Sequence, residues 1–519
     1  MPVAAINEQE TTQARGPEDA REGSYRQIMK SSSLVGGAQV VNILVGMVRT
    51  KFVAVLLGPA GVGLQGTYLA ITGLVQTLTS LGIGASGVRD VAQAHGTGDA
   101  ERVARTVLTL RRMVWLTGFV GTVLLAALAG PISRYTFGTS SHAFPLALLS
   151  ATVLMACLAG GQSALLQGTR RIADLARMTV LGTGVGSAVA IAMYYAYGLK
   201  GIVPALMIMA AFNLAVAWWF ARRIPVASVA MSWRESFAQA GGLVSLGVAM
   251  MLSGLVMAGT VYLSRVFITR QIGLEAVGIF HAGSALSAMF IDFVLKAMGA
   301  DFYPRLTAAS SDPREMNRLV NEQTEIGLLL AVPGLVATLV LAPWVIRIFY
   351  TAEFVPAVDL MRWFVFGCLG RVASWPMGFI ILAMGRGRLF FASETAFGVV
   401  HVLLTWFGLR LFGLTGVGIA FLLVYVFYTA FMLIISRRLI GFRWNRGVRT
   451  LCVSLIPPSI AAFAISSFLP ILPATLLGGT IAVAVCLYCL RELAKRLGPE
   501  HRICRLIQGL PYARTFIPV

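Results

Sequence analysis

A set of ionisable side chains lies inside long apolar stretches of this chain, where a charge is costly unless it faces a cavity or a partner. The set comprises Arg49, Lys51, Asp292, Lys296, Arg371, Glu394 and His401. Its cations outnumber its carboxylates. A cavity lined by these groups would therefore attract an anion, and arginine and lysine both suit a phosphate or pyrophosphate.

The first apolar stretch places its polar residues along one stripe of a helix. The stripe runs through Gln39, Asn42, Gly46 and Arg49. These positions are spaced i, i+3, i+7 and i+10, so they share one face, which we expect to point into a helix bundle. Gln39, Asn42 and Arg49 are thus candidates for a substrate cavity. Lys51 points to nearly the opposite side and either snorkels to the outer surface or meets a neighbouring helix.

Three further positions combine cations with carboxylates. Asp292 and Lys296 are spaced i, i+4, so they either neutralise each other or form a titratable pair that exchanges with substrate or a coupling proton. Arg371 is the deepest arginine by our span boundaries, and we expect it in the cavity, followed by Lys51 and Lys296. Glu394 and His401, seven apart, share a face. Glu394 either pairs with Arg371 or Lys296 or couples transport to an ion.

The other charged positions in apolar stretches are less central. Arg265 and Arg362 fall near the outer ends of their stretches, so we expect both to snorkel.

The elements that must position these groups are membrane-spanning helices. Hydrophobic residues make up 57% of the 519 residues, charged residues only 12%, and the mean hydropathy is +0.78. A span needs roughly 20 apolar residues, and about fourteen stretches qualify. We place them at 33–57, 62–83, 113–129, 143–166, 175–197, 201–221, 241–267, 275–303, 326–346, 359–384, 389–410, 414–436, 450–469 and 473–490. The expected fold class is an all-α polytopic membrane protein.

Positive charge orients the chain. With the N-terminus inside, only five of the 42 lysines and arginines fall in outside loops: Arg134, Lys200, Arg270, Arg347 and Arg410. This asymmetry follows the positive-inside rule and predicts a multi-pass membrane protein with two cytoplasmic termini. The formal charge of +20 is spread over many loops that meet anionic lipid, so we expect no nucleic-acid partner.

A weak internal repeat divides the spans into two lobes. The motif from Gly198 to Ala205 recurs 215 residues later from Gly413 to Ala420, and the arginine pair at 222–223 recurs at 437–438. The glycines at 58 and 63 match those at 273 and 278, whereas Gly168 matches Gly385 at an offset two residues longer. Two parallel six-helix repeats would place a substrate site between the lobes.

The repeat and the charge pattern together predict the domain organisation. We expect a disordered cytoplasmic tail (1–30), a first six-helix lobe (31–223), a cytoplasmic linker (224–240), a second six-helix lobe (241–438), an extra transmembrane hairpin (449–490) and a basic cytoplasmic tail (491–519).

Several chemistries are not indicated. Five of the six cysteines fall inside spans, and the CxxC of Cys486 and Cys489 lies within a helix in lipid, so we expect neither a redox nor a metal site. The chain has no GxxxxGK[ST] loop, nor a nucleophile–base arrangement that stands out. We therefore expect no cofactor, no ATP-driven pumping and no enzyme activity.

Three segments resemble the Wzx-type flippases of O-antigen and lipid III. They are KFVAVLLGPAGVG at 51–63 followed by VAQA at 91–94, AVGIF at 276–280 running to Pro304-Arg305-Leu306, and RLFFASE at 388–394. Within the family pattern Lys51, Arg388 and Glu394 sit at matching positions, and we expect Arg388 at a cytoplasmic gate. The resemblance covers about residues 31–440.

The resemblance implies membership of the multidrug/oligosaccharidyl-lipid/polysaccharide exporter superfamily. Its members have two six-helix lobes around a cavity of alternating access, and the Wzx branch moves undecaprenyl-pyrophosphate-linked oligosaccharides. Many have twelve spans, whereas the related lipid II flippase has fourteen.

We therefore expect a flippase for an O-antigen, lipid III or exopolysaccharide unit. The resemblance implies a location in the bacterial inner membrane. The partners it implies are membrane lipids, a polysaccharide polymerase and a chain-length regulator. The alternatives are a cation-coupled multidrug exporter, a membrane glycosyl polymerase or ligase, and a non-transporting polysaccharide-assembly protein. The polymerase alternative is disfavoured because the outside loops are short.

Overall fold

The computed structural model describes residues 17–497, with side chains from residue 36 except at 242–246, 249, 300 and 497. The first half of the described chain forms α1 (Pro17–Thr79), α2 (Ile83–Gly96), α3 (Ala100–Phe137), α4 (Ala143–Gly168), α5 (Ile172–Tyr197), η1 (Gly198–Gly201) and α6 (Ile202–Ala221). The second half forms α7 (Trp233–Gln271), α8 (Leu274–Ala308), α9 (Pro313–Phe349), η2 (Ala352–Phe354), α10 (Ala357–Ala383), α11 (Gly387–Ile440), α12 (Arg446–Phe468) and α13 (Ile471–Leu497).

Eleven runs of the described chain are long and apolar enough to cross a membrane. Three of these runs bend sharply, at Gly58 in α1, at Gly198 between α5 and α6, and at Gly413 in α11. Each bend has a positive φ, which glycine adopts without the steric cost that a Cβ would add. Counting the two arms of each bent run gives the fourteen spans expected, and the all-helical membrane fold is confirmed.

The bends recur in the two halves of the chain. Three residues with positive φ in the first half have a counterpart with positive φ 215 positions later. The pairs are Gly58 and Gly273, Arg170 and Gly385, and Gly198 and Gly413. The turn at Arg170 and its counterpart at Gly385 therefore also keep the common offset of 215 residues. The sequence match of Gly168 with Gly385 was wrong by two residues, because the left-handed position in the first copy is Arg170.

Equivalent helices also begin in the same way. The side chain of Asp99 accepts hydrogen bonds from two backbone N–H groups at the start of α3, and Asp312 does the same at the start of α9. An aspartate in this position satisfies donors that the first helical turn leaves free. The two lobes are thus built from the same succession of elements, α1–α6 and α7–α11.

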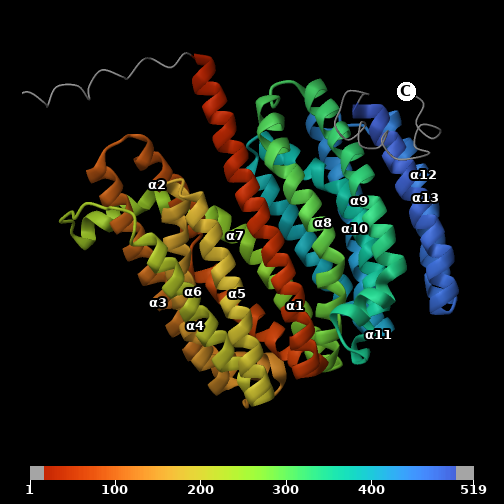
Figure 1. Cartoon of the computed structure of the whole chain (residues 1–519), viewed down its shortest axis with the longest axis horizontal. Helices are drawn as coiled ribbons and strands as arrows, with labels where there is room; N and C mark the ends of the chain where they lie inside the picture. The colour runs from red at the N-terminus through yellow and green to blue at the C-terminus, as the bar shows by residue number, and fades with distance from the viewer. Residues whose placement is uncertain (1–16, 498–519) are drawn as a thin grey trace, which may run out of the picture.

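Figure 1 shows α2–α6 as one group and α8–α13 as another, with α1 and α7 between them. The two ends of the described chain lie on the same side, which we call the terminal side. The groups approach each other most closely on the opposite side. A buried core there joins Leu57 and Leu146 of the first lobe to Ile346 and Phe354 of the second.

The terminal-side end of α7 is fastened to the first lobe rather than to the second. The Arg112 guanidinium of α3 donates to the carbonyls of Met231 and Ser232 at 2.8 and 2.9 Å and to Ser236 Oγ at 2.6 Å. Gly247 of α7 also packs directly on the turn at Gly82, where a Cβ would lie 2.2 Å from the Gly247 carbonyl oxygen. The helix that opens the second repeat therefore links the two lobes.

Arginine–tryptophan pairs mark both edges of the helical slab. On the terminal side the Arg223 guanidinium lies 3.7 Å from the Trp219 ring centre, and on the opposite side Arg410 lies 4.0 Å from Trp406. Tryptophan concentrates where lipid headgroups meet hydrocarbon. These pairs indicate where the slab meets the two membrane surfaces.

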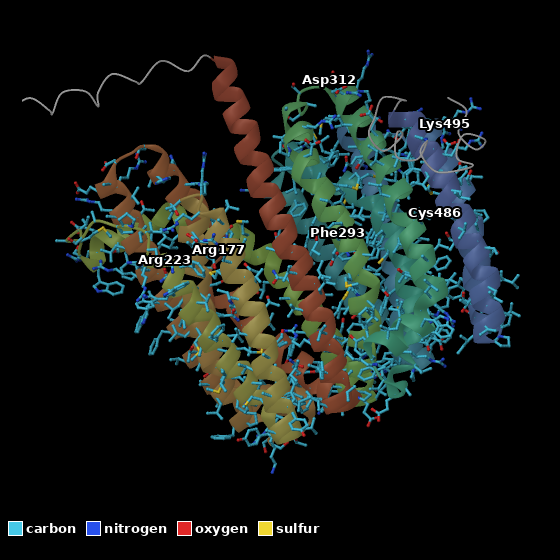
Figure 2. All side chains as sticks on the ribbon, viewed as in Figure 1. Arg177, Arg223, Phe293, Asp312, Cys486 and Lys495 are labelled. Atoms are coloured by element: carbon cyan, nitrogen blue, oxygen red, sulfur yellow. The ribbon has the colours of Figure 1, made fainter. Side chains whose placement is uncertain are left out.

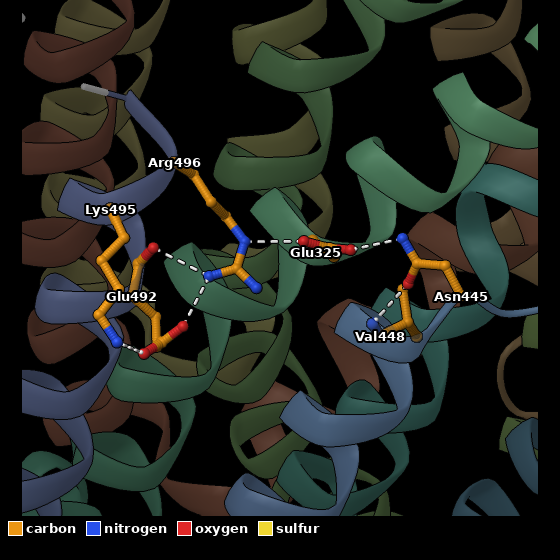
Figure 3. A network of polar contacts seen from close by, with 6 residues as sticks. All are labelled: Glu325, Asn445, Val448, Glu492, Lys495 and Arg496. Carbon is orange, nitrogen blue, oxygen red and sulfur yellow. Dashed lines mark hydrogen bonds and ion pairs between the residues drawn. The ribbon is translucent and has the colours of Figure 1, made fainter.

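The C-terminal hairpin α12–α13 packs on α9 through a polar network (Figure 3). The Arg496 Nε lies 2.7 Å from Glu325 Oε2, and the Asn445 amide donates to Glu325 Oε1 at 2.7 Å. Asn445 also caps α12 by accepting from the backbone N–H of Val448. Apolar packing on the same helix adds Leu455 and Val485 to the core of the second lobe.

The chain boundaries differ in detail from the expected domains. Of the expected tail 1–30, residues 17–30 are the first turns of α1, and residues 1–16 lie outside the described part. The helix α7 begins at Trp233, inside the expected linker 224–240, because Ser232 and Glu235 form a capping box there. Residues 491–497 continue α13, and 498–519 lie outside the described part.

Candidate functional site

Arg265 of α7 reaches across the boundary between the lobes. Its guanidinium donates to the backbone carbonyl of Gly66 in α1, and its Nη2 lies 3.5 Å from the Nδ1 of His281 in α8. A Cβ on residue 66 would lie 3.3 Å from Nη1, so glycine leaves room for the guanidinium. The Arg265 Nε is buried and has no hydrogen-bond partner among the described residues, which is unusual for a buried polar group.

Arg49 of α1 lies beside this group. It interacts electrostatically with His281 and with Tyr194 of α5. The Arg49 side chain is half-buried and has no carboxylate partner within the described chain. We call Arg49, Arg265 and His281 the inter-lobe cationic site, because α1 belongs to the first repeat while α7 and α8 belong to the second.

The rest of the α1 stripe leads from this site toward the terminal side. The Asn42 Oδ1 is buried and accepts no hydrogen bond in the described structure, while Gln39, one turn earlier, is exposed. A buried unpaired acceptor is costly unless a ligand or water satisfies it. The Asn42 Oδ1 can therefore accept one further hydrogen bond.

Lys51 is two residues from Arg49 on α1, but its side chain leaves this stripe and reaches the C-terminal end of α9. Its Nζ donates to the carbonyl of Arg347 at 2.9 Å and to that of Tyr350, both at the C-terminal end of α9. A cation at a helix C-terminus satisfies orphan carbonyls and complements the negative end of the helix dipole. Of the two positions expected for Lys51, the structure has the one against a neighbouring helix, and that helix belongs to the other lobe.

The second lobe holds its own group of charges. Arg371 Nη2 of α10 lies 2.8 Å from Asp292 Oδ1 of α8. Asp292 therefore pairs across helices, rather than with Lys296 one turn away, because the Arg371 fork is within reach. The Lys296 side chain is exposed, and none of its neighbours in the described chain forms an ion pair with it.

Glu394 has a different partner from either of those expected. Its Oε1 accepts a hydrogen bond from Tyr428 Oη at 3.1 Å, with Arg371 bound elsewhere. His401 lies two turns further along the same face of α11, edge-on to Phe397 at 5.9 Å between ring centres and close to Phe421, so it sits among aromatic rings. Arg388 is exposed in the first turn of α11, on the terminal side.

The sequence reasoning missed two members of the inter-lobe cationic site. Arg265 was expected to snorkel, but its guanidinium turns inward to Gly66, and His281 was not singled out. The general rule that ionisable residues inside spans face a cavity or partner would have found both. Among the residues that the structure describes, no cluster of histidine, cysteine and carboxylate side chains could hold a metal ion.

The fold and this site define a two-lobed helical membrane protein with cationic groups gathered where its lobes meet. The profile of the family described as "Polysaccharide biosynthesis protein" matches residues 52–359, more than half of the chain. The chain belongs to this family.

Relatives and solved structures extend the comparison. The chain is 23% identical over 412 residues to the "Lipid III flippase" of Escherichia coli (strain K12), which covers 77% of this chain and 96% of that protein. Its fold is similar to the "Lipid II flippase MurJ" in an inward closed conformation, with a TM-score of 0.69 at 13% identity over 89% of this chain and 99% of that one. The fold is also similar to that of a multidrug resistance MATE family transporter of the MOP superfamily in an inward-facing conformation. The TM-score is 0.60 at 15% identity, and the match covers 77% of this chain and 95% of that one. The predicted resemblance to the Wzx branch is confirmed.

Proposed function

We propose that this protein is a flippase that moves an undecaprenyl-pyrophosphate-linked oligosaccharide across the bacterial inner membrane. The observation that carries the proposal is the inter-lobe cationic site, where Arg49 and Arg265 come from different repeats and neither pairs with a carboxylate in the described chain. Its family and its lipid III flippase relative support the same substrate class.

The site suits the head of such a lipid. Two guanidiniums offer forked donors to a pyrophosphate, and the unpaired Arg265 Nε and Asn42 Oδ1 add a donor and an acceptor nearby. The glycan would pass between the lobes while the polyprenyl tail stays in lipid. Rocking of the lobes about the site then exposes it to one side and the other in turn.

Other parts of the proposal concern coupling and surroundings. We assign Asp292, Glu394 and His401 to coupling or to support of the second lobe. Arg371 and Lys296 belong to the cationic surface of that lobe. Arg388 belongs to a gate on the terminal side. The charge asymmetry of the loops supports a cytoplasmic location of that side. The protein acts as a transporter rather than an enzyme, and a polysaccharide polymerase and chain-length regulator would act on its product.

Complementation tests the proposal in a Gram-negative strain that lacks its own O-antigen and lipid III flippases. We expect the wild type to restore surface glycan, and Arg49→Ala and Arg265→Ala to reduce it at least about tenfold at equal expression, as for the loss of a charge-assisted hydrogen bond. The matched control is Arg134→Ala, an exposed arginine at the far end of α3. Full activity of both site variants would contradict the proposed site.

The drug-exporter alternative is supported by fold likeness to MATE transporters. A site for cationic drugs should carry carboxylates, whereas the inter-lobe site is cationic. Resistance to cationic drugs, without rescue of surface glycan in several glycan backgrounds, would favour the exporter. Failure of both assays would leave a non-transporting role in polysaccharide assembly.

A further inference from the structure

A groove on the first lobe lies outside the inter-lobe site. It has a volume of about 650 Å³ and opens between the first arm of α1 and the adjoining ends of α5 and α6. Its apolar walls are formed by Val41, Val180, Leu181, Trp219 and Phe220. Gly37, Ala38 and Ala176 complete the walls with small side chains, so the space between the helices is left open.

Two arginines stand at the groove, Arg177 near the start of α5 and Arg223 just after α6 (Figure 2). Figure 2 shows both on the same face of the first lobe. They lie on the terminal side, where Trp219 marks the level of the lipid headgroups. The apolar walls extend from there into the level of the hydrocarbon.

The charge around the groove is positive and incompletely balanced. The Asp174 carboxylate pairs with Arg171 at 2.6 Å and reaches Arg177 only at 3.4 Å. Arg223 stacks on Trp219, an arrangement that leaves the edge of its guanidinium free to donate. Two guanidiniums thus share the Asp174 carboxylate, and Arg223 adds a positive charge that forms no ion pair within the described chain. An anion between Arg177 and Arg223 would restore the balance.

We propose that this groove binds an anionic glycerophospholipid from the leaflet on the terminal side. The phosphate accepts hydrogen bonds from Arg177 and Arg223, and one acyl chain fills the space between α1 and α5–α6. Charge complementarity identifies the headgroup. The apolar walls at hydrocarbon depth, with arginines only at headgroup depth, match a lipid rather than a soluble phosphate.

The bound lipid supports the arm of α1 that carries Arg49. On this arm Val41 and Leu44 are 42% and 56% exposed, so it has few protein neighbours at this depth. A lipid between this arm and α5–α6 holds the arm against the first lobe. The site therefore supports α1 without forming part of the inter-lobe cationic site.

Native mass spectrometry of the full-length protein, released from nanodiscs of phosphatidylglycerol and phosphatidylethanolamine, tests the site. We expect phosphatidylglycerol to be retained by the wild type and reduced about tenfold in Arg177→Gln/Arg223→Gln. The control Arg234→Gln/Arg314→Gln removes two exposed arginines from the same side and should retain the lipid. Equal retention in the groove variant and the wild type would overturn the proposal.

A second pair of variants tests the chain-binding space without changing charge. Ala38→Trp fills the groove and should release the lipid, whereas Val40→Trp, on another face of the same helix, should not. The proposal is overturned if Ala38→Trp retains phosphatidylglycerol. It is also overturned if added undecaprenyl diphosphate, but not phosphatidylglycerol, binds in an Arg177- and Arg223-dependent manner, because the groove then belongs to the transported lipid.

Discussion

At the scale of the residue, the role of each charged side chain inside the membrane depends on whether it already forms an ion pair. Arg371 and Asp292 satisfy each other at 2.8 Å, whereas Arg49 and Arg265 have no carboxylate partner in the described chain. A charge that already has a partner is less available to a substrate. The second-lobe pair is therefore better suited to holding α8 and α10 together, and the unpaired arginines to binding.

A double-mutant cycle distinguishes these roles for Arg371. We expect Arg371→Gln and Asp292→Asn each to lower thermal stability in detergent, by about 1–2 kcal/mol because the pair is only partly buried. The double variant should lose less than the sum, because neither charge is then left alone. Strict additivity of the three values would show that the pair contributes nothing to stability.

A histidine outside the spans predicts a dependence on pH. His142, in the loop before α4, has its Nδ1 2.8 Å from Tyr68 Oη, and burial lowers the pKa of His142 below its ordinary value of 6.5. The folded state then binds a proton less readily than the unfolded state, so stability falls as the pH drops below about 6.5. Thermal unfolding between pH 5 and 8 should show this slope in the wild type and a flatter one in His142→Gln. An unchanged slope in the variant would assign it to other groups.

At the scale of the element, both helices of the extra hairpin contact the same carboxylate. Glu325 of α9 receives Arg496 from α13 and Asn445 from the start of α12, and its side chain is 12% exposed (Figure 3). Because both helices of the hairpin meet at this residue, it adds to the docking that the apolar contacts of Leu455 and Val485 already provide. The hairpin is thus an addition to the second lobe rather than a third lobe.

Removing that carboxylate should loosen the hairpin. We expect Glu325→Gln to cost about 1–3 kcal/mol, the range for a buried group deprived of a charged partner. Hydrogen exchange should rise in α12 and α13 and remain unchanged in α3. Glu322→Gln, one turn away on the exposed face, is the control and should leave the hairpin protected. Equal protection in Glu325→Gln would show that apolar packing alone holds the hairpin.

At the scale of the whole molecule, the lobes close on the side opposite the termini. Gly63 of α1 and Gly278 of α8 pack backbone to backbone, since a Cβ on either would lie 2.0 Å from a carbonyl oxygen of the other helix. Lys51 adds its bonds to the end of α9 in the same region. Alternating access requires this contact to open, so it is the place where a substitution should bias the two states.

Replacing Gly63 or Gly278 by valine should disfavour the conformation in which the lobes are closed on the side opposite the termini. With spin labels at Lys200→Cys and Arg410→Cys, in a background without native cysteines, we expect Gly63→Val and Gly278→Val to lengthen the inter-label distances and to reduce glycan export. The control is Gly73→Val on the same helix as Gly63, where no atom lies within 4 Å of the added Cβ. Unchanged distances in both variants would show that this contact does not set the state.

The chain alone predicts the number of spans, their orientation and the duplication. Hydropathy and loop charge depend on short windows of sequence and on the membrane as solvent, so they need no knowledge of neighbours. The glycine turns at 58, 198, 273 and 413 were recognisable for a similar reason, because a positive φ restricts the residue type at that position itself. The common offset of Arg170 and Gly385 was missed because arginine gives no such signal.

The partners of the site residues depend on how helices that are distant in the sequence pack against one another. Asp292 was four residues from one cation, but its partner came from another helix, and Arg265 turned to a carbonyl of the other lobe instead of the surface. In a low-dielectric interior, a charge pairs with whichever group the packing brings within about 3 Å, whatever its distance in sequence. Spacing along one helix therefore identified which residues are expensive to bury, and only the packing of both lobes showed which of them remain free to bind.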